Sequence, residues 1–150
     1  MAMKENYQNL KDKITREEAR REFYTKMGQR LGDKELFILM YLANHRTAVE
    51  KVRNILPDSV DETYVIDIDA SDTIANIATS IKTDYQFVRK AIYALSLMGL
   101  VVKNGMKNNA QSWLITREGG LVLNYVIELE DTNLQNKSLT ERYKEVAKNR

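Results

Sequence analysis

The 150-residue chain contains no cysteine, one proline, one histidine and one tryptophan. Without cysteine it can form neither a disulfide nor a thiolate metal site. No apolar run approaches the roughly 20 residues that a membrane-spanning helix needs. The start, MAMKENYQNLKDK, is too polar for a secretory signal. We therefore expect a cytoplasmic protein with no membrane partner and no cofactor.

No arrangement of residues typical of catalysis or metal binding stands out in the sequence. His45 is the only histidine, and no nucleophile or acid pattern accompanies it. The acidic run 58–72 lacks the regular spacing and the turn glycine of a calcium loop. Gly28-x-x-x-Gly32 is not a phosphate loop, because no strand precedes it and no Lys-Ser or Lys-Thr follows. We expect no catalytic residue, no bound metal and no enzymatic activity.

What the chain does have is an uneven distribution of charge. Its length favours one domain and its hydrophobic content of 43% can supply a core, while the net charge is only +2. The segment 58–72 is acidic and contains no basic residue, whereas one acidic residue accompanies the basic residues Lys82, Arg89, Lys90, Lys103, Lys107 and Arg117. A basic segment beside an acidic one can orient a protein on a polyanion.

The basic segment coincides with two short helical patterns between Thr73 and Val101. Their apolar residues recur at helical spacing, in the stripes Ile74, Ala75, Ile77, Ala78, Ile81 and Val88, Ala91, Ile92, Leu95. Ser71 or Asp72 should cap the first helix and Asp84 the second. Only Lys82 and Thr83 separate the two patterns, so the helices should cross sharply, as in a helix-turn-helix.

A hairpin and a further helix should follow. Gly99 should end the second helix in the left-handed conformation, and residues 100–103 read as a strand. Asn104-Gly105 is a turn signal, after which residues 106–110 should be mobile. The segment 111–116 reads as the returning strand, and 118–130 as a helix.

This order of helix, turn, helix, hairpin and helix resembles the winged helix-turn-helix family over residues 64–125. The family's apolar, small and glycine positions are matched by Ala78, Val88, Leu95, Gly99-Leu100-Val101 and Ile115-Thr116-Arg117-Glu118-Gly119. Two positions depart from the pattern. Lys82 stands where the turn often has glycine, and the wing offers Lys107, Asn108 and Asn109 where arginine is frequent. The resemblance implies a mostly α fold with a small antiparallel sheet.

The flanking segments complete the expected organisation. An amphipathic helix within 4–31 should fray at Gly28 and Gly32, and Asp33 should cap a core helix, 34–44. A short helix over 49–56 should end at Pro57, and 64–68 should be the first strand. We expect a helical extension (1–32), a winged domain (33–130) and a loosely attached, charged helical tail (131–150). MarR-like regulators have similar terminal additions, which implies a homodimer.

The outer face of the second helix carries the candidate DNA contacts. Arg89 can read guanine and Gln86 adenine, while lysines meet phosphates. The full set of expected contacts is Lys82, Thr83, Tyr85, Gln86, Arg89, Lys90, Tyr93, Lys103, Lys107, Asn108 and Asn109. The alternative is an ordinary solvated helix face.

Three functions follow in order of preference. The first is a transcriptional regulator, most commonly a repressor, that binds double-stranded DNA as a dimer. The second is an accessory protein of plasmid or phage replication, partition or conjugation, since Leu39-Met40-Tyr41-Leu42-Ala43-Asn44-His45 resembles the opening of such replication proteins. The third is a protein–protein scaffold that uses a winged helix. The sequence leaves the DNA target and any small-molecule effector open.

Overall fold

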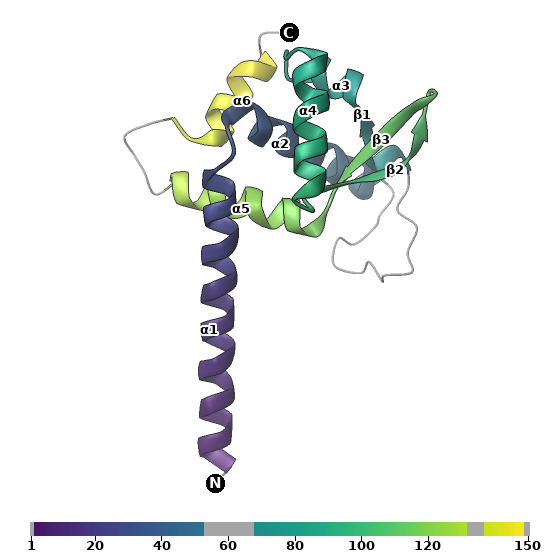
Figure 1. Cartoon of the computed structure of the whole chain (residues 1–150). Helices are drawn as coiled ribbons and strands as arrows, with labels where there is room; N and C mark the ends of the chain where they lie inside the picture. The colour runs from purple at the N-terminus through teal and green to yellow at the C-terminus, as the bar shows by residue number, and fades with distance from the viewer. Residues whose placement is uncertain (1, 53–67, 132–136, 149–150) are drawn as a thin grey trace.

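Helices dominate the computed structural model, which describes residues 2–52, 68–131 and 137–148, and a small sheet lies beside them (Figure 1). The helices are α1 (Ala2–Gln29), α2 (Asp33–Val52), the 3-10 helix η2 (Ile68–Ala70), α3 (Ile74–Ser80), α4 (Tyr85–Leu97), α5 (Arg117–Asp131) and α6 (Leu139–Lys148). The strands are β1 (Asp72–Thr73), β2 (Val101–Lys107) and β3 (Ala110–Ile115). The predicted fold class, mostly α with a small antiparallel sheet, is confirmed.

One hydrophobic core joins the central elements. The segment 36–40 of α2 is buried along its whole length, and it packs with the inner faces of α3, α4 and α5. Because α2 contacts helices on several sides, it is apolar around much of its circumference rather than on one stripe. α2 runs unbroken to Val52, so residues 49–52 continue this helix and do not begin the separate short helix that was expected over 49–56. Residues 53–57 lie outside the described part of the chain.

The C-terminal helix is part of this core. Leu139 is fully buried, and the rings of Phe37 and Tyr143 lie 5.8 Å apart. Arg142 joins three elements, because its guanidinium donates to both carboxylate oxygens of Asp33, at 3.0 Å each, and to those of Glu130. The expectation of a loosely attached tail is therefore wrong for α6.

The start of α2 also differs from the expectation. Asp33 is the first helical residue, and its carboxylate is taken up by Arg142 instead of capping the helix. The Glu35 carboxylate accepts a hydrogen bond from the Gly32 backbone N–H, which is one half of a capping box.

α1 projects from the rest of the molecule, and only its C-terminal part packs against α5 (Figure 1). Gly28 is the point of closest approach, because a Cβ atom there would lie 2.2 Å from Val126 Cγ2. The rings of Tyr24 and Tyr125 stack with centroids 6.2 Å apart. Gly28 thus lies in a helix–helix contact and is not the frayed end that the sequence suggested.

The sheet has the order β1-β3-β2, with all pairs antiparallel. Asp72 pairs with Trp113, and the first strand within the described residues is the two-residue segment β1. Ile68 belongs to η2, and residues 64–67 lie outside the described part of the chain. Asp69 also lies in η2.

The hairpin turns later than predicted. Lys107 pairs with Ala110 across Asn108 and Asn109, whose φ values are 52° and 63°. Two successive residues at positive φ form a type I′ turn, and asparagine tolerates this geometry. Asn104 and Gly105 instead form a bulge within β2, where the register shifts between Lys103 and Met106. The expected turn at 104–105 and the mobile stretch 106–110 are therefore wrong.

Candidate nucleic-acid interface

The two helices of the predicted helix-turn-helix begin at side-chain caps. The Asp84 carboxylate accepts from the backbone N–H groups of Gln86 and Phe87, at 3.1 and 3.2 Å, as predicted for α4. α3 is capped by Thr73, whose hydroxyl accepts from the backbone N–H of Asn76 at 3.3 Å. The expected caps Ser71 and Asp72 are wrong, because both side chains belong to other hydrogen-bond networks.

The turn between α3 and α4 is a Schellman motif centred on Lys82. The Thr83 N–H donates to Ala78 O at 3.0 Å and the Lys82 N–H to Thr79 O at 3.4 Å. Lys82 has a φ of 53°, a conformation that glycine adopts more easily. Gly99, at a φ of 77°, ends α4 in the same way, as predicted. The protein thus holds a lysine side chain at the turn position where glycine would have the lower conformational cost.

α4 has one buried and one exposed face. The buried face consists of Val88, Ala91, Ile92 and Leu95. Gln86, Arg89 and Lys90 are exposed on the other side, and neither basic side chain forms an ion pair with a described residue. The Arg89 guanidinium lies 5.9 Å from the centre of the Tyr93 ring. The exposed face therefore presents two cationic groups and an amide that are free to meet an anionic partner.

Tyr93 connects this face to the sheet. Its ring meets the fully buried Trp113 of β3 edge to face, with centroids 5.5 Å apart. Trp113 is part of the hydrophobic core. Tyr93 is 47% exposed, so its other side remains on the surface with Arg89 and Tyr85. The tyrosine thus has a packing role in addition to its predicted place on the contact face.

The wing supplies fewer open cations than the sequence suggested. Lys103 is exposed on β2, and Asn108 and Asn109 are exposed at the hairpin tip. Lys107 is partly buried, and its ammonium donates to the backbone carbonyl of Ser71 at 3.4 Å. The hairpin extends beside α4 and away from α1 (Figure 1). Lys107 therefore holds the wing against the segment before α3 as well as adding positive charge.

The hydroxyl of Thr116 and the absence of a side chain at Gly119 fix the junction between β3 and α5. Thr116 caps α5, since its Oγ1 accepts from the Gly119 N–H at 3.0 Å, and it donates to Gly99 O at 2.7 Å. A Cβ at Gly119 would lie 2.2 Å from Leu100 O, which leaves no room for a side chain. The Ile115-to-Gly119 pattern therefore has a packing reason that does not depend on any ligand.

A buried hydrogen-bond network holds the start of α3. Asp72 Oδ2 accepts from the Tyr41 hydroxyl at 2.5 Å, and Oδ1 from the Asn76 amide at 2.8 Å. Burial raises the pKa of Asp72, but these donors and the Thr73 N–H outweigh it and leave the pKa below its usual value. Burial and the adjacent carboxylate raise the pKa of Tyr41 to about 12. Asp72 is thus a charged structural anchor at the start of the helix-turn-helix.

His45 lies within α2 and not at its end. Its Nε2 lies 2.8 Å from Asp69 O, and its ring stacks on Tyr41 with centroids 5.9 Å apart. Among residues 2–52, 68–131 and 137–148, no group of three histidine, aspartate or glutamate side chains could hold a metal ion. Within the same ranges, none of the helices is both long and apolar enough to cross a membrane.

Two residues near the interface were missed by the sequence reasoning. Leu97 is 92% exposed near the C-terminal end of α4, on the same face as Gln86, Lys90 and Tyr93. A helical projection of the sequence would have found it, since it lies eleven residues after Gln86. Lys34 lies with its ammonium 5.0 Å from the Phe87 ring centre. No local signal relates Lys34 to Phe87, because the two residues are 53 positions apart in the sequence.

Comparisons with known proteins find solved structures of similar shape whose sequence identity to this chain is low. No protein-family model matches the chain, and no curated protein matches it. MepR, a transcription regulator of the Staphylococcus aureus multidrug efflux pump MepA, is 18% identical, with 95% of this chain and 92% of that chain covered and a TM-score of 0.47. A MepR mutant of S. aureus bound to an oligodeoxyribonucleotide is 15% identical, with 95% and 91% covered and the same TM-score.

The transcriptional regulator Tm0710 from Thermotoga maritima is 17% identical, with 73% of this chain and 83% of that chain covered and a TM-score of 0.34. The fold is defined by the chain's own geometry. Two helices joined by a Schellman turn, a hairpin with a tight turn and a following helix make this a winged helix-turn-helix protein with additional helices at both ends.

Proposed function

We propose that this protein binds double-stranded DNA through α4 and regulates transcription as a homodimer. The observation that carries the proposal is the exposed face of α4. Gln86, Arg89 and Lys90 lie within its first two turns, where a helix in a major groove reaches base edges. No described acidic side chain pairs with the two cations, so phosphate or guanine can take them up without breaking an ion pair.

The individual contacts follow from side-chain chemistry. Arg89 would donate two hydrogen bonds to a guanine, and Gln86 would pair with an adenine. Lys82, Lys90, Lys103 and Lys107 would meet phosphates, together with the hydroxyl of Thr83 and the amides of Asn108 and Asn109. Tyr85 and Tyr93, each 47% exposed, would contribute their free ring faces and hydroxyls.

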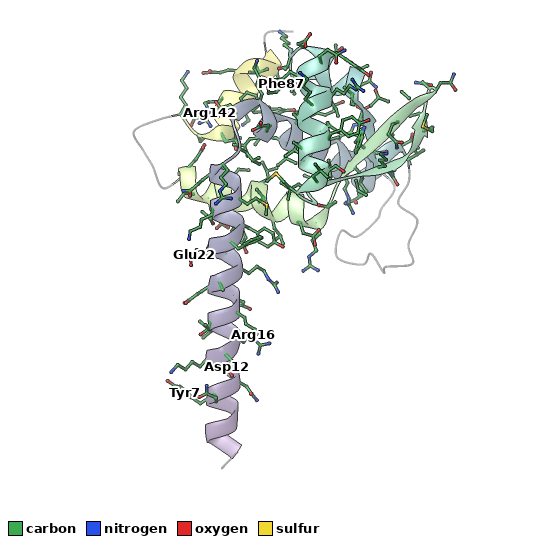
Figure 2. All side chains as sticks on the ribbon, viewed as in Figure 1. Tyr7, Asp12, Arg16, Glu22, Phe87 and Arg142 are labelled. Atoms are coloured by element: carbon green, nitrogen blue, oxygen red, sulfur yellow. The ribbon has the colours of Figure 1, made fainter. Side chains whose placement is uncertain are left out.

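The dimer proposal rests on α1, in the extension 1–32. Tyr7, Leu10 and Ile14 are 70%, 57% and 47% exposed, although their spacing of three and four places them on one helical face. Figure 2 shows Tyr7, Asp12 and Arg16 on the part of α1 that projects beyond every other element. An exposed apolar stripe on a long helix favours burial against a partner, and a second copy is the commonest one.

DNA affinity measured by fluorescence anisotropy tests the proposal, with duplexes selected from a random pool. We expect Arg89→Ala to weaken binding about tenfold or more through a lost base contact. Lys90→Ala should weaken binding of all duplexes alike. Lys13→Ala is the matched control, because it removes an exposed lysine from the projecting part of α1. Unchanged affinity in both α4 variants would refute the assignment.

Light scattering tests the dimer separately. Leu10→Lys with Ile14→Lys should convert a dimer to a monomer without unfolding the winged domain, because neither side chain contacts the core. A wild-type monomer at micromolar concentration would refute this part of the proposal and leave DNA binding by a monomer intact.

The scaffold alternative predicts binding that does not depend on the charges of α4. The plasmid or phage alternative gains no support from its sequence clue, since Leu39 and Leu42 are fully buried in the core and the match reflects packing. Selection from a random DNA pool still separates the roles, because a palindrome fits a dimeric regulator and a repeat array fits replication or partition.

A further inference from the structure

Leu97, in the last turn of α4, is the most exposed large apolar side chain in the part of the chain that the structure describes, at 92%. Four exposed side chains of α4 follow one another at intervals of four, three and four residues, namely Gln86, Lys90, Tyr93 and Leu97. Side chains at this spacing lie in one row along a helix. The row that begins with the proposed DNA contacts therefore continues to the C-terminal end of α4, where it ends in a leucine.

The surroundings of this row in the chain are cationic. No acidic residue occurs in the sequence from Tyr85 to Arg117. Lys90 lies within the row, Lys103 is exposed on the strand that follows, and neither forms an ion pair with a described residue. A partner that covers Leu97 therefore also meets positive charge that no nearby acid in the chain offsets, and this favours a polyanion.

A second copy of this chain fits the row less well. In a two-fold dimer the same surface patch of each subunit meets its counterpart, so Arg89 and Lys90 would face the same cations of the other copy. Like charges brought together in this way oppose association. DNA offers negative charge for the lysine and, in its major groove, one apolar group, the 5-methyl group of thymine.

The length of the row constrains how α4 can lie on a duplex. Gln86 and Leu97 are separated by roughly 16 Å along the helix axis, at a rise of about 1.5 Å per residue. The major groove is about 12 Å wide. A helix that crossed the groove would hold only one end of the row against the bases. Both ends reach base edges only when α4 follows the groove along its length.

We propose that α4 follows the major groove over its full length and that Leu97 packs against the 5-methyl group of a thymine. This inference rests on the proposed function and adds a base preference to it, because cytosine has no methyl group at that position. Tyr93 lies four residues before Leu97, and its ring is held by the edge-to-face contact with Trp113. Tyr93 would therefore provide a fixed wall beside the methyl group.

Uracil in place of thymine tests the contact, because it removes the methyl group and keeps every hydrogen-bonding group of the base. The full-length protein is used with duplexes that it selects from a random pool, and affinity is measured by fluorescence anisotropy after each thymine is replaced singly. We expect one thymine at which uracil weakens wild-type binding about two- to fivefold, the loss of one buried methyl group. This thymine should lie at a base pair other than the one that Arg89 reads.

Variants of Leu97 assign the effect to this side chain. Leu97→Ala should weaken binding of the thymine duplex by a similar factor and should bind the thymine and uracil duplexes equally. Leu97→Met keeps an apolar side chain of similar volume and should retain the preference for thymine. Leu129→Ala is the matched control, because it removes a 42% exposed leucine from α5, and its thymine-to-uracil affinity ratio should equal that of the wild type.

Equal thymine-to-uracil ratios in Leu97→Ala and in the wild type, at every thymine, would overturn the inference. Binding that still depends on Arg89 would then leave the proposed function intact. A smaller assembly of Leu97→Ala in light scattering would also overturn the inference, because Leu97 would then pack against a second copy. A protein that binds no duplex at all would overturn the proposed function and this inference with it.

Discussion

The ring of Tyr93 meets the indole of Trp113 edge to face, 5.5 Å between centroids, so α4 and the returning strand of the wing are packed together. A displacement of one element would expose the chain's single tryptophan, which is otherwise fully buried. This aromatic contact therefore links the candidate contact face to the wing.

Replacement of Tyr93 should be visible in the tryptophan fluorescence. Tyr93→Ala should lower the free energy of unfolding by about 1–2 kcal/mol, because it removes the aromatic contact and uncovers the indole. The emission maximum of Trp113 should shift to longer wavelength. Tyr93→Phe keeps the ring and should leave the emission unchanged. An unshifted spectrum in Tyr93→Ala would show that other side chains shield the indole.

Substitutions of Lys82 should change the free energy of unfolding and the DNA affinity independently. Lys82→Gly should raise the free energy of unfolding by about 1 kcal/mol, because glycine adopts the left-handed conformation without a Cβ penalty. Its DNA affinity should nevertheless fall, since a phosphate contact is lost. Lys82→Gln keeps the strained conformation and should lose affinity with no gain in stability. Denaturant unfolding and anisotropy on the same samples check both effects.

Two helical glycines should respond to alanine in opposite directions. Gly28→Ala should destabilise the protein by about 1–3 kcal/mol, because its Cβ would collide with Val126 at the α1–α5 contact. Gly120→Ala, in α5, meets nothing within 4 Å and should stabilise by about 0.5–1 kcal/mol. Thermal unfolding of the two variants measures the difference, and stabilisation by both would contradict the close packing of α1 on α5.

The Tyr41–Asp72 pair should give stability a dependence on pH at both extremes. The pKa of Asp72 is lowered in the fold, so its contribution is present above the unfolded pKa of about 3.9 and is lost as pH falls through the folded value. The pKa of Tyr41 is raised to about 12, so the neutral phenol stabilises the fold below pH about 10, and this is lost between about 10 and 12.

Tyr41→Phe isolates this pair. The variant should lose the alkaline decline that Tyr41 causes, and its acid decline should be smaller, because Asp72 has one donor fewer to hold its pKa down. Urea unfolding measured from pH 2 to 12 gives both the acid and the alkaline decline in the free energy of unfolding. Identical profiles for the wild type and Tyr41→Phe would mean that the hydroxyl does not interact with the carboxylate.

Features set by neighbouring residues could be predicted from the sequence. The Asp84 cap, the left-handed Gly99 and the inner face of α4 each depend on side chains within a few positions, so their patterns were sufficient. The exposed state of Gln86, Arg89 and Lys90 followed from the same periodicity. The fold could be predicted because these local features occur in an order that few architectures share.

Features that depend on residues far apart in the sequence could not be predicted. β1 is only two residues long, and Asp72 is held there by Tyr41, 31 positions earlier. Asn104-Gly105 and Asn108-Asn109 are both acceptable local turns, and cross-strand register with packing of Gly105 near Ile68 selects the later one. The docking of α6 depends on Arg142 reaching Asp33, 109 positions away.

The dependence of DNA affinity on salt tests the central claim most directly. For the wild type, the logarithm of the association constant should fall linearly and steeply with the logarithm of salt concentration, since phosphate contacts release counterions. Lys90→Gln should reduce the slope by about 1, the loss of one phosphate contact. A slope near zero, or the same slope in Lys90→Gln and in the wild type, would contradict an α4 that lies against the DNA backbone.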